Sequence, residues 1–353
     1  MKRALVVQTA YLGDVVLSQP LWTALKRTSP DCRVDVLVQP QWAPLIEHDP
    51  DINQVIRFDK RGAQRGWRGL RRMARQLRAE QYDVAFCPHP SFRSALLLRL
   101  AGIPARIGFD DSAGAGFFTQ VVRRDRALHE VDRVLSLLAA IGVRPADQDR
   151  APKLFVDREK AEAQLARLGI QPGARFVCAH PGSVWATKRW PPEGFAAVLS
   201  DLADDGFAPV ILGGADDVVE ANQVQDHCRT LPINLVGRLA LPDLALLLFR
   251  ASLLVTNDSG PMHIAGALGT PVVAVFGSTT PALGYGPVGS RSRIVEHPLP
   301  CRPCGPHGRR RCPLDHFDCM RRIGAEQVTA SCRELLSSRC DWNSKPMMRD
   351  GRF

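Results

Sequence analysis

Short apolar runs, rich in β-branched residues, alternate with helical stretches along almost the whole chain, and this alternation limits the fold more than any other feature. In the first half, runs at residues 4–7, 34–38 and 82–87 alternate with helical patterns such as 15–26 and 94–101. Strands separated by helices form βαβ units, whose strands pair in parallel. The pattern therefore predicts a doubly wound α/β domain.

The same alternation restarts after a polar, proline-bearing stretch at residues 144–153. Four further buried strands are expected at residues 176–179, 209–212, 253–256 and 272–276. A chain of 353 residues is long enough for two domains, each with its own core. We expect Rossmann-like domains at 1–150 and 151–324, followed at 325–353 by a C-terminal helix and a polar tail.

The composition excludes several classes of protein. Hydrophobic residues make up 45% of the chain and charged residues 23%, as in globular rather than disordered proteins. The longest uncharged stretch, residues 264–290, contains three prolines and cannot form one membrane-spanning helix. The apolar run after Met1-Lys2-Arg3 is too short for a secretory signal, so we expect the chain in the cytoplasm.

A net charge of +10 suggests anionic partners. Residues 57–78 hold nine basic side chains and a single acid, Asp59. Leu70, Met73 and Leu77 share one face of a helix there, which leaves the arginines on the other. Solvation alone, contact with acidic lipid, or contact with a phosphorylated acceptor would each explain such a face.

Asp14 follows the first expected strand, at the start of a helix. A dinucleotide-binding turn would carry three spaced glycines here, but this segment has only Gly13, which disfavours nicotinamide chemistry. A carboxylate at this position is either an ordinary helix cap or a base that takes a proton from a sugar hydroxyl.

The turn at residues 180–191 follows a strand of the second half and suits phosphate. It combines a glycine-serine pair with Thr187 and Lys188, and so offers N–H groups, hydroxyls and cations around Ser183. It is not a P-loop, because the Gly-Lys-Ser/Thr ending is absent.

The segment at residues 257–271 also follows a strand and opens a helix, which Asp258 or Ser259 is expected to cap. The residues expected to place free N–H groups in its first turn are Ser259, Gly260, Met262 and His263. Such a turn is either an anion site, to which His263 adds a donor, or the start of a purely structural helix.

Four cysteines cluster with the spacing C-x2-C-x7-C-x6-C, at Cys301, Cys304, Cys312 and Cys319. A structural zinc site would favour two close pairs, and only the first pair fits, although His307 and His316 could substitute. Zinc binding, disulfides and reduced thiols all stay open, with a reduced loop favoured in the cytoplasm. No carboxylate motif for a catalytic metal is found.

The chain resembles glycosyltransferase family 9, the ADP-heptose:lipopolysaccharide heptosyltransferases, and most closely the heptosyltransferase II branch. The resemblance runs from the first strand to the last helix, and the order and spacing of its motifs are specific. The motifs are Gly13-Asp14, His180-Pro181-Gly182-Ser183 with Lys188 and Trp190, Gly213-Gly214, Asp258-Ser259-Gly260-Pro261-Met262-His263, and the cysteine cluster with Pro313-Leu314.

The resemblance implies a GT-B architecture, in which two Rossmann-like domains face across a cleft, the first holding a lipid-linked acceptor and the second an ADP-sugar. It implies an inverting enzyme without metal or cofactor, in which Asp14 is the general base and Lys188 contacts the diphosphate and the sugar. The implied nucleotide-sugar site consists of Ser183, Thr187, Lys188, Asp258, Ser259, Gly260, Met262 and His263, with Gly237 and Arg238 near the adenosine.

The predicted function is transfer of L-glycero-D-manno-heptose from ADP-heptose to the inner core of nascent lipopolysaccharide. The expected partners are ADP-heptose, a lipid-linked core oligosaccharide and the cytoplasmic face of the inner membrane, touched peripherally by a monomer that binds no nucleic acid. One alternative is a GT-B enzyme that uses or epimerises another nucleotide sugar. The other is a basic nucleic-acid- or membrane-binding protein, although no nucleic-acid-binding signature accompanies the charge.

Overall fold

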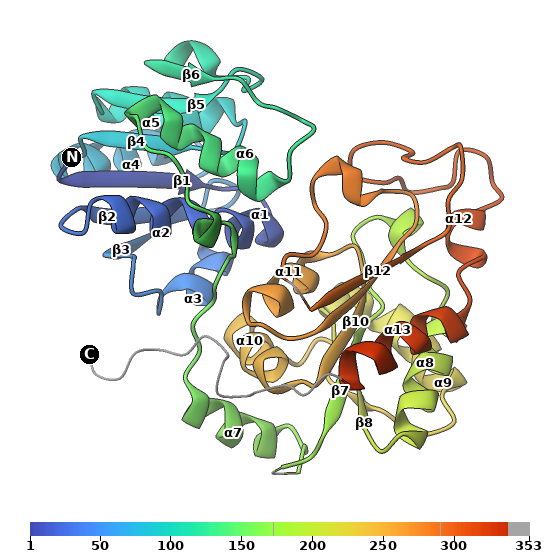
Figure 1. Cartoon of the computed structure of the whole chain (residues 1–353). Coiled ribbons are helices and arrows are strands. Elements are labelled where there is room, and N and C mark those ends of the chain that lie inside the picture. The colour runs from blue at the N-terminus through green and yellow to red at the C-terminus, as the bar shows by residue number, and fades with distance from the viewer. Residues whose placement is uncertain (172, 290, 338–353) are drawn as a thin grey trace. The chain divides into compact units, whose positions relative to one another are not determined.

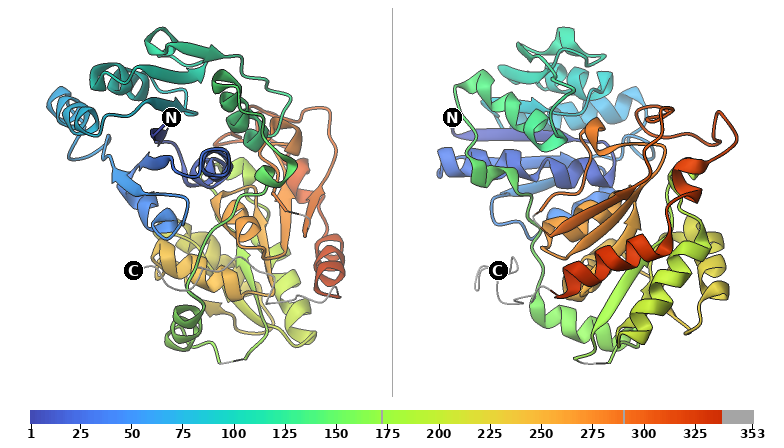
Figure 2. Two further views of the ribbon diagram at one scale, coloured as in Figure 1. Left: turned by 60° about the vertical axis from the view of Figure 1, so that its left-hand side comes forward. Right: turned by 45° about the vertical axis from the view of Figure 1, so that its right-hand side comes forward.

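The chain divides into two compact units, Met1–Leu154 and Phe155–Phe353 (Figure 1). The computed structural model describes residues 1–171, 173–289 and 291–337, so the predicted polar tail lies outside the described residues. Each unit is a parallel sheet of six strands with helices on both faces (Figures 1 and 2). The predicted α/β class with two doubly wound sheets is therefore confirmed.

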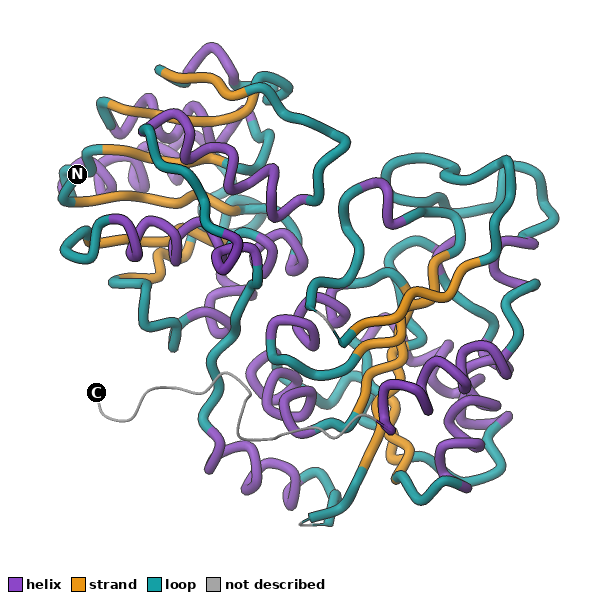
Figure 3. Tube along the Cα trace, in the orientation of Figure 1, coloured by secondary structure: helices purple, strands orange, loops and turns teal. Residues whose placement is uncertain are grey.

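Strands and helices alternate along most of unit 1, Met1–Leu154, although β5 and β6 are joined through only a short 3-10 turn (Figure 3). Its main elements are β1 (Arg3–Gln8), α1 (Leu12–Leu17), α2 (Gln19–Thr28), β2 (Arg33–Val38), α3 (Ala43–Ile46), β3 (Gln54–Arg57), α4 (Trp67–Ala79), β4 (Val84–Cys87), α5 (Phe92–Ala101), β5 (Ala105–Phe109), β6 (Gln120–Val122) and α6 (Glu130–Ser136). The strand order is β3-β2-β1-β4-β5-β6. The order changes direction between β1 and β4, where a sheet of this kind binds ligands at the carboxyl ends of its strands.

Unit 2, Phe155–Phe353, repeats this arrangement. Its main elements are α7 (Arg158–Arg167), β7 (Phe176–His180), α8 (Pro192–Asp204), β8 (Ala208–Ile211), α9 (Val218–His227), β9 (Ile233–Asn234), α10 (Leu241–Arg250), β10 (Leu253–Asn257), α11 (Gly260–Ala267), β11 (Val272–Phe276), β12 (Ser292–Glu296), α12 (Asp318–Arg321) and α13 (Ala325–Ser337). The order β12-β11-β10-β7-β8-β9 has its own change of direction between β7 and β10. The segments that follow these two strands are the two predicted phosphate-binding segments.

One predicted helix is wrong. The pattern at residues 15–26 predicts one helix, but the structure has two, α1 and α2, which are separated at Ser18. Pro20 lies in the first turn of α2, where its missing N–H is tolerated, although it could not continue a helix from α1. The Ser18 hydroxyl instead donates to the carbonyl of Asp14 at 2.7 Å, and so closes the end of α1.

The core of unit 1 includes the side of the sheet that α4 and α5 cover. In α4, Leu70, Met73 and Leu77 are buried against the sheet, and the arginines between them are exposed, as the sequence predicts. In unit 2, α8, α9 and α13 cover one face of the sheet in the same way. The helix α13 begins at Ala325, as predicted. No helix within the described ranges is long and apolar enough to cross a membrane.

Candidate functional site

Asp14 is the third residue of α1, just beyond the carboxyl end of β1. Its Oδ2 accepts the backbone N–H of Tyr11 at 3.1 Å, so the side chain caps the helix. Burial, helped by the negative charge of Glu130, raises the pKa of Asp14 to about 6, against the opposing effects of the Tyr11 N–H and Arg124. The same side chain is thus a helix cap and a carboxylate whose pKa suits proton transfer near neutral pH.

Glu130, at the start of α6, is a neighbour of Asp14 that the sequence did not reveal. It is 3% exposed and lies between two arginines. Its carboxylate oxygens accept from Arg124 Nη2 at 2.6 and 2.8 Å, and one of them accepts from Arg133 Nη1 at 3.0 Å. Only the three-residue spacing of Glu130 and Arg133 is visible as a pattern in the sequence, and that spacing is common on helices.

A cationic edge lies at the carboxyl ends of β1 and β4. Lys60 Nζ donates to Thr9 Oγ1 at 2.9 Å, and Thr9 Oγ1 is 3.0 Å from Ser94 Oγ. Burial and the charge of Arg61 lower the pKa of Lys60 to about 8. Burial, with the charge of Lys60, also lowers the pKa of His89 to about 4, so that its imidazole is neutral at pH 7. Mutually repelling cations of this kind favour an anionic ligand.

In unit 2, Lys188 and Asp258 form a buried ion pair. Lys188 ends the short 3-10 turn Ala186–Lys188, and its Nζ is 2.6 Å from Asp258 Oδ2. The same carboxylate oxygen accepts the hydroxyl of Thr279 at 2.7 Å. These two contacts connect the segments that follow β7, β10 and β11. They keep the Lys188 ammonium group next to β7 and β10, the two strands between which the strand order changes direction. Thr279 was missed because no motif marks it.

Thr187 ties the same turn to the cysteine-containing loop. Its Oγ1 is 2.9 Å from Ser278 Oγ and accepts the backbone N–H of Arg309 at 2.7 Å. The backbone N–H of Thr187 donates to the carbonyl of Arg309 at 3.1 Å. Ser183 is buried and accepts the Nε of Arg189 at its carbonyl, at 2.8 Å. These bonds fix the backbone on both sides of Lys188.

The start of α11 differs from the prediction in two ways. Ser259 occupies the N-cap position, but its hydroxyl does not cap the helix, because it is engaged by His180 Nδ1 and Thr256 Oγ1, both at 3.1 Å. The N–H of Met262 was expected to be free, but it donates to the carbonyl of Ser259 at 3.2 Å. Met262 and His263 are both buried, and Gly260 is the first residue of the helix.

His180 and Asp217 form a second pair that the sequence did not reveal. His180 Nε2 is 3.5 Å from Asp217 Oδ2, which also accepts the N–H of Gly214 at 2.9 Å. Burial alone would raise the pKa of Asp217, but the hydrogen bond and charge of His180 lower it below its usual value. A Cβ at Gly182 would lie 2.0 Å from Asp217 Oδ1, so the close approach of this carboxylate requires glycine.

Gly237 and Arg238 follow β9 and lie beside the turn after β8. Gly237 adopts φ of 72°, and its N–H donates to the carbonyl of Gly213 at 3.1 Å. Arg238 is exposed, and its Nη1 donates to the carbonyl of Asn234 at 3.4 Å. Neither residue has a hydrogen bond to the Lys188–Asp258 pair.

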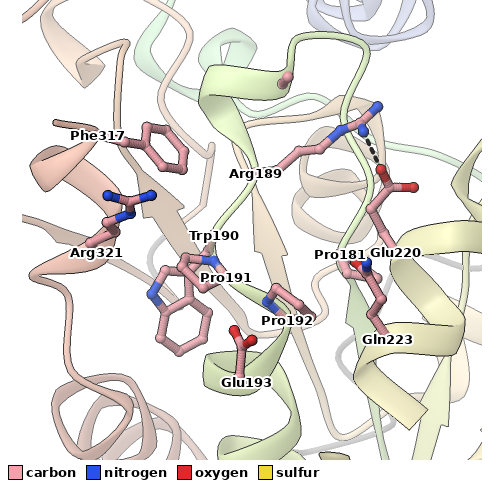
Figure 4. A pocket seen from close by; sticks show the side chains of 11 residues that line it. Pro181, Arg189, Trp190, Pro191, Pro192, Glu193, Glu220, Gln223, Phe317 and Arg321 are labelled. Carbon is pink, nitrogen blue, oxygen red and sulfur yellow. Dashed lines mark hydrogen bonds and ion pairs between the residues drawn. The ribbon is translucent and has the colours of Figure 1, made fainter. Parts of the chain in front are cut away.

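A pocket of about 400 Å³ lies beside the predicted turn (Figure 4). Figure 4 shows the ion pair of Arg189 and Glu220 on one side of the pocket and Phe317 and Arg321 on the other. Its lining residues are Pro181, Ala186, Arg189, Trp190, Pro191, Pro192, Glu193, Glu220, Gln223, Phe317 and Arg321. None of the predicted site residues lines it, although five of its lining residues belong to the turn at residues 180–191 that carries Lys188.

The clustered cysteines are free thiols. Cys301 Sγ is 3.9 Å from His316 Nε2, and Cys304 Sγ is 3.4 Å from the carbonyl of Cys301. Burial, followed by the charges of neighbouring cysteines, raises the pKa of Cys304. Within the described part of the chain, no three histidine, cysteine or acidic side chains converge so as to hold a metal ion.

The sequence model of glycosyltransferase family 9 (heptosyltransferase) matches residues 70–315. Lipopolysaccharide heptosyltransferase 2 of Escherichia coli strain K12 is 29% identical over 318 residues, which cover 83% of this chain and 87% of that protein. Lipopolysaccharide heptosyltransferase 3 of the same strain is 29% identical over 282 residues, covering 76% of this chain and 80% of that protein.

The fold gives the same result. The crystal structure of a family 9 glycosyltransferase from Veillonella parvula matches with a TM-score of 0.86 at 26% identity, covering 96% of this chain and 98% of that one. The predicted GT-B-like class is therefore confirmed. Because the family match spans well over half of its length, the chain belongs to glycosyltransferase family 9, the heptosyltransferases.

Proposed function

We propose that this chain transfers L-glycero-D-manno-heptose from ADP-heptose to the inner core of nascent lipopolysaccharide, with the acceptor choice of a heptosyltransferase II. Family membership supports the reaction class, and the relatives named lipopolysaccharide heptosyltransferase 2 support the substrates. The Lys188–Asp258 pair is the observation that supports a donor site in the second unit. It holds a cation at the edge where a parallel α/β sheet binds its ligand.

The donor site acts on the leaving group. As the bond from the sugar to ADP breaks, negative charge grows on the β-phosphate. Lys188 keeps N–H donors after its contact with Asp258, since an ammonium group has three. The N–H groups of Ser259 and Gly260 at the start of α11 add their dipoles. One pre-oriented donor of this kind lowers the barrier by about 3 kcal/mol.

The acceptor site supplies the base. Asp14, with a pKa of about 6, is ionised at pH 7 and can take the proton of the attacking hydroxyl. Attack on the face opposite to ADP inverts the configuration at the sugar carbon. General-base catalysis of this kind accelerates a reaction by roughly 10²–10⁴-fold. The cationic edge around Lys60 suits a phosphorylated or carboxylated acceptor.

The remaining assignments are also proposals. Residues 1–150 bind the acceptor, and residues 151–324 bind ADP-heptose, with Ser183 and Thr187 shaping the turn and Gly237 and Arg238 near the adenosine. The enzyme requires no metal and no cofactor, and it works as a monomer. It acts on the cytoplasmic face of the inner membrane, because its acceptor is lipid-linked.

The test is a matrix of donors and acceptors. Purified protein is incubated with ADP-heptose, ADP-glucose or UDP-glucose, and with core acceptors that carry no heptose, one heptose or two. Mass spectrometry then reports the product. The proposal expects a gain of one heptose only with ADP-heptose and only on the acceptor that already carries one heptose. A gain on the heptose-free acceptor or on the two-heptose acceptor would reassign the branch, and a gain only with another donor would reject the proposal.

A further inference from the structure

The outer surface of α4 and α5 carries a dense positive charge that the mechanism does not use. The two helices pack against each other and bury their apolar sides on the same face of the sheet. Neither helix contains an acidic residue. The exposed arginines of this surface, here called the basic face, are Arg68, Arg71, Arg72, Arg75, Arg78 and Arg99.

Acidic side chains near the basic face are engaged elsewhere. Glu80, just beyond α4, pairs with Arg3 at 3.2 Å. Asp59 accepts the backbone N–H groups of Gly62 and Ala63, both at 2.7 Å, and so closes its own loop. Across the described residues, no carboxylate lies within ion-pair distance of Arg68, Arg72 or Arg75. The positive charge of Arg68, Arg72 and Arg75 is therefore not neutralised by an acidic side chain of residues 1–171, 173–289 or 291–337.

Exposed aromatic side chains flank the start of both helices. Trp67 begins α4 and is 49% exposed, and Phe92 begins α5 and is 52% exposed. Arg93 joins the two helix starts, since its Nη2 donates to the carbonyls of Gln64 at 2.6 Å and Gly66 at 3.2 Å. Arginine beside exposed tryptophan is the combination that proteins use at the headgroup region of a bilayer.

We propose that the basic face of α4 and α5 docks on an anionic phospholipid bilayer. The guanidinium of Arg71 covers the ring of Trp67, 5.1 Å from its centre. Single-stranded RNA binds by stacking its bases on open aromatic faces, so this arrangement favours lipid over RNA as the ligand. The apolar side of α4 is already buried in the core, so contact is electrostatic and does not require insertion. The proposal deepens the proposed function, on which it rests for a lipid-linked acceptor that brings the enzyme to a bilayer.

The test is cosedimentation with vesicles that contain neither donor nor acceptor, so its outcome does not depend on the assigned reaction. One set contains equal parts of phosphatidylglycerol and phosphatidylcholine, and the other contains phosphatidylcholine alone. The full chain should bind only the anionic set, and less tightly as salt rises. Each arginine near such a surface contributes about fivefold in affinity, so the triple variant Arg68→Ala, Arg72→Ala and Arg75→Ala should bind roughly a hundredfold more weakly.

Two controls make the result specific. The triple variant Arg33→Ala, Arg123→Ala and Arg144→Ala removes the same charge from exposed positions outside the basic face, and it should bind nearly as well as the unchanged protein. The basic-face variant should fold, because alanine has the highest helix propensity, and it should keep full activity on a delipidated acceptor. Absence of binding to anionic vesicles, an equal loss in both triple variants, or tighter binding to mixed-sequence RNA than to vesicles would overturn the proposal.

Discussion

At the scale of single residues, the pKa that suits Asp14 to its proposed role as the base also lowers the stability of the fold at neutral pH. Its pKa rises from 3.8 to about 6 in the folded protein, so the folded state favours the protonated form. Below about pH 4 this pKa shift does not affect the free energy of unfolding. As the pH rises from 4 through 6, the free energy of unfolding falls, because the carboxyl group ionises more readily in the unfolded chain. A shift of this size corresponds to about 3 kcal/mol at neutral pH.

Asp14→Asn should therefore lower activity and raise stability together. We expect the turnover number to fall by roughly 10²–10⁴-fold, because the amide cannot accept the proton. At pH 7 the free energy of unfolding should rise, by up to about 3 kcal/mol, since the partly buried side chain then carries no charge. Steady-state rates, ADP calorimetry and urea denaturation measure these effects. Asp31→Asn, at an exposed position, should change none of them.

Near-normal transfer by Asp14→Asn would remove it as the base. A loss of ADP affinity equal to the loss of rate would instead show that the variant disturbs the fold.

If Asp14 is the base, Glu130 should influence the pH at which the enzyme is active. Its negative charge helps to raise the pKa of Asp14, so Glu130→Gln should shift the acidic limb of kcat/KM below pH 6. The glutamine oxygen can replace the oxygen that accepts from both Arg124 and Arg133, but its NH2 group cannot accept the second bond from Arg124, so urea denaturation is the check that the variant folds. Asp132→Asn, on the same helix, should leave the limb in place because Asp132 pairs with Arg150 at 2.6 Å. An unshifted limb in Glu130→Gln would contradict this electrostatic role.

At the scale of elements, central parallel strands could be predicted from the sequence because they are buried on both faces and so read as apolar runs. The edge strands β3, β6, β9 and β12 were not predicted, and neither was β5, whose first two residues are only half-buried. The strand β11, Val272–Phe276, matches its predicted run of residues. The break between α1 and α2 could also have been expected from Pro20, but the apolar spacing continues across it and hides it. The 3.6-residue spacing of apolar residues shows which side of a helix is buried, but it does not show whether the helix is continuous.

The contacts of the proposed donor site could not be predicted in the same way. Lys188 and Asp258 are 70 residues apart, and the sequence shows only that each follows a strand. Their contact depends on the placement of β7 beside β10, which local patterns do not specify. Ser278 and Thr279 follow β11 without any distinguishing motif, so their bonds to Thr187 and Asp258 are visible only in the structure.

Lys188→Ala should weaken donor binding and slow transfer. The variant loses a charge-assisted contact with the diphosphate, for which we expect about 10–100-fold weaker binding of ADP-heptose. It also leaves the Asp258 carboxylate with the hydroxyl of Thr279 but without the cation of Lys188, which adds repulsion toward the diphosphate. Calorimetry with ADP and initial rates measure both effects. Lys160→Ala, at an exposed position of α7, is the matched control. Unchanged affinity and rate in Lys188→Ala would place the diphosphate elsewhere.

At the scale of the whole molecule, the two sheets share one strand order although they differ in sequence. In each unit an aspartate follows a strand next to the change of direction in the strand order. This aspartate is Asp14 after β1 in unit 1 and Asp258 after β10 in unit 2. Two αβ alternations in the sequence were enough to predict two doubly wound sheets. The individual partners of each side chain were not predictable, because they depend on tertiary packing between strands that are distant in the sequence.

Chelation tests how the molecule stabilises the leaving group. If Lys188 and the N–H groups of α11 neutralise the diphosphate, EDTA should leave the transfer rate unchanged. The assay uses freshly purified enzyme with ADP-heptose and acceptor, with and without the chelator. A loss of activity that Mg²⁺ or Mn²⁺ restores would assign that task to a metal ion. Mass spectrometry of the native protein would show in the same sample whether the cysteine loop carries zinc.

The most direct test of the account is a single-turnover reaction in which excess enzyme converts labelled ADP-heptose in the presence of the one-heptose acceptor. If the enzyme transfers the sugar directly, ADP release and the gain of one heptose on the acceptor should proceed at the same rate and in equal amounts. Release of ADP with free heptose, or recovery of the nucleotide sugar with an altered configuration and no change in the acceptor, would contradict it.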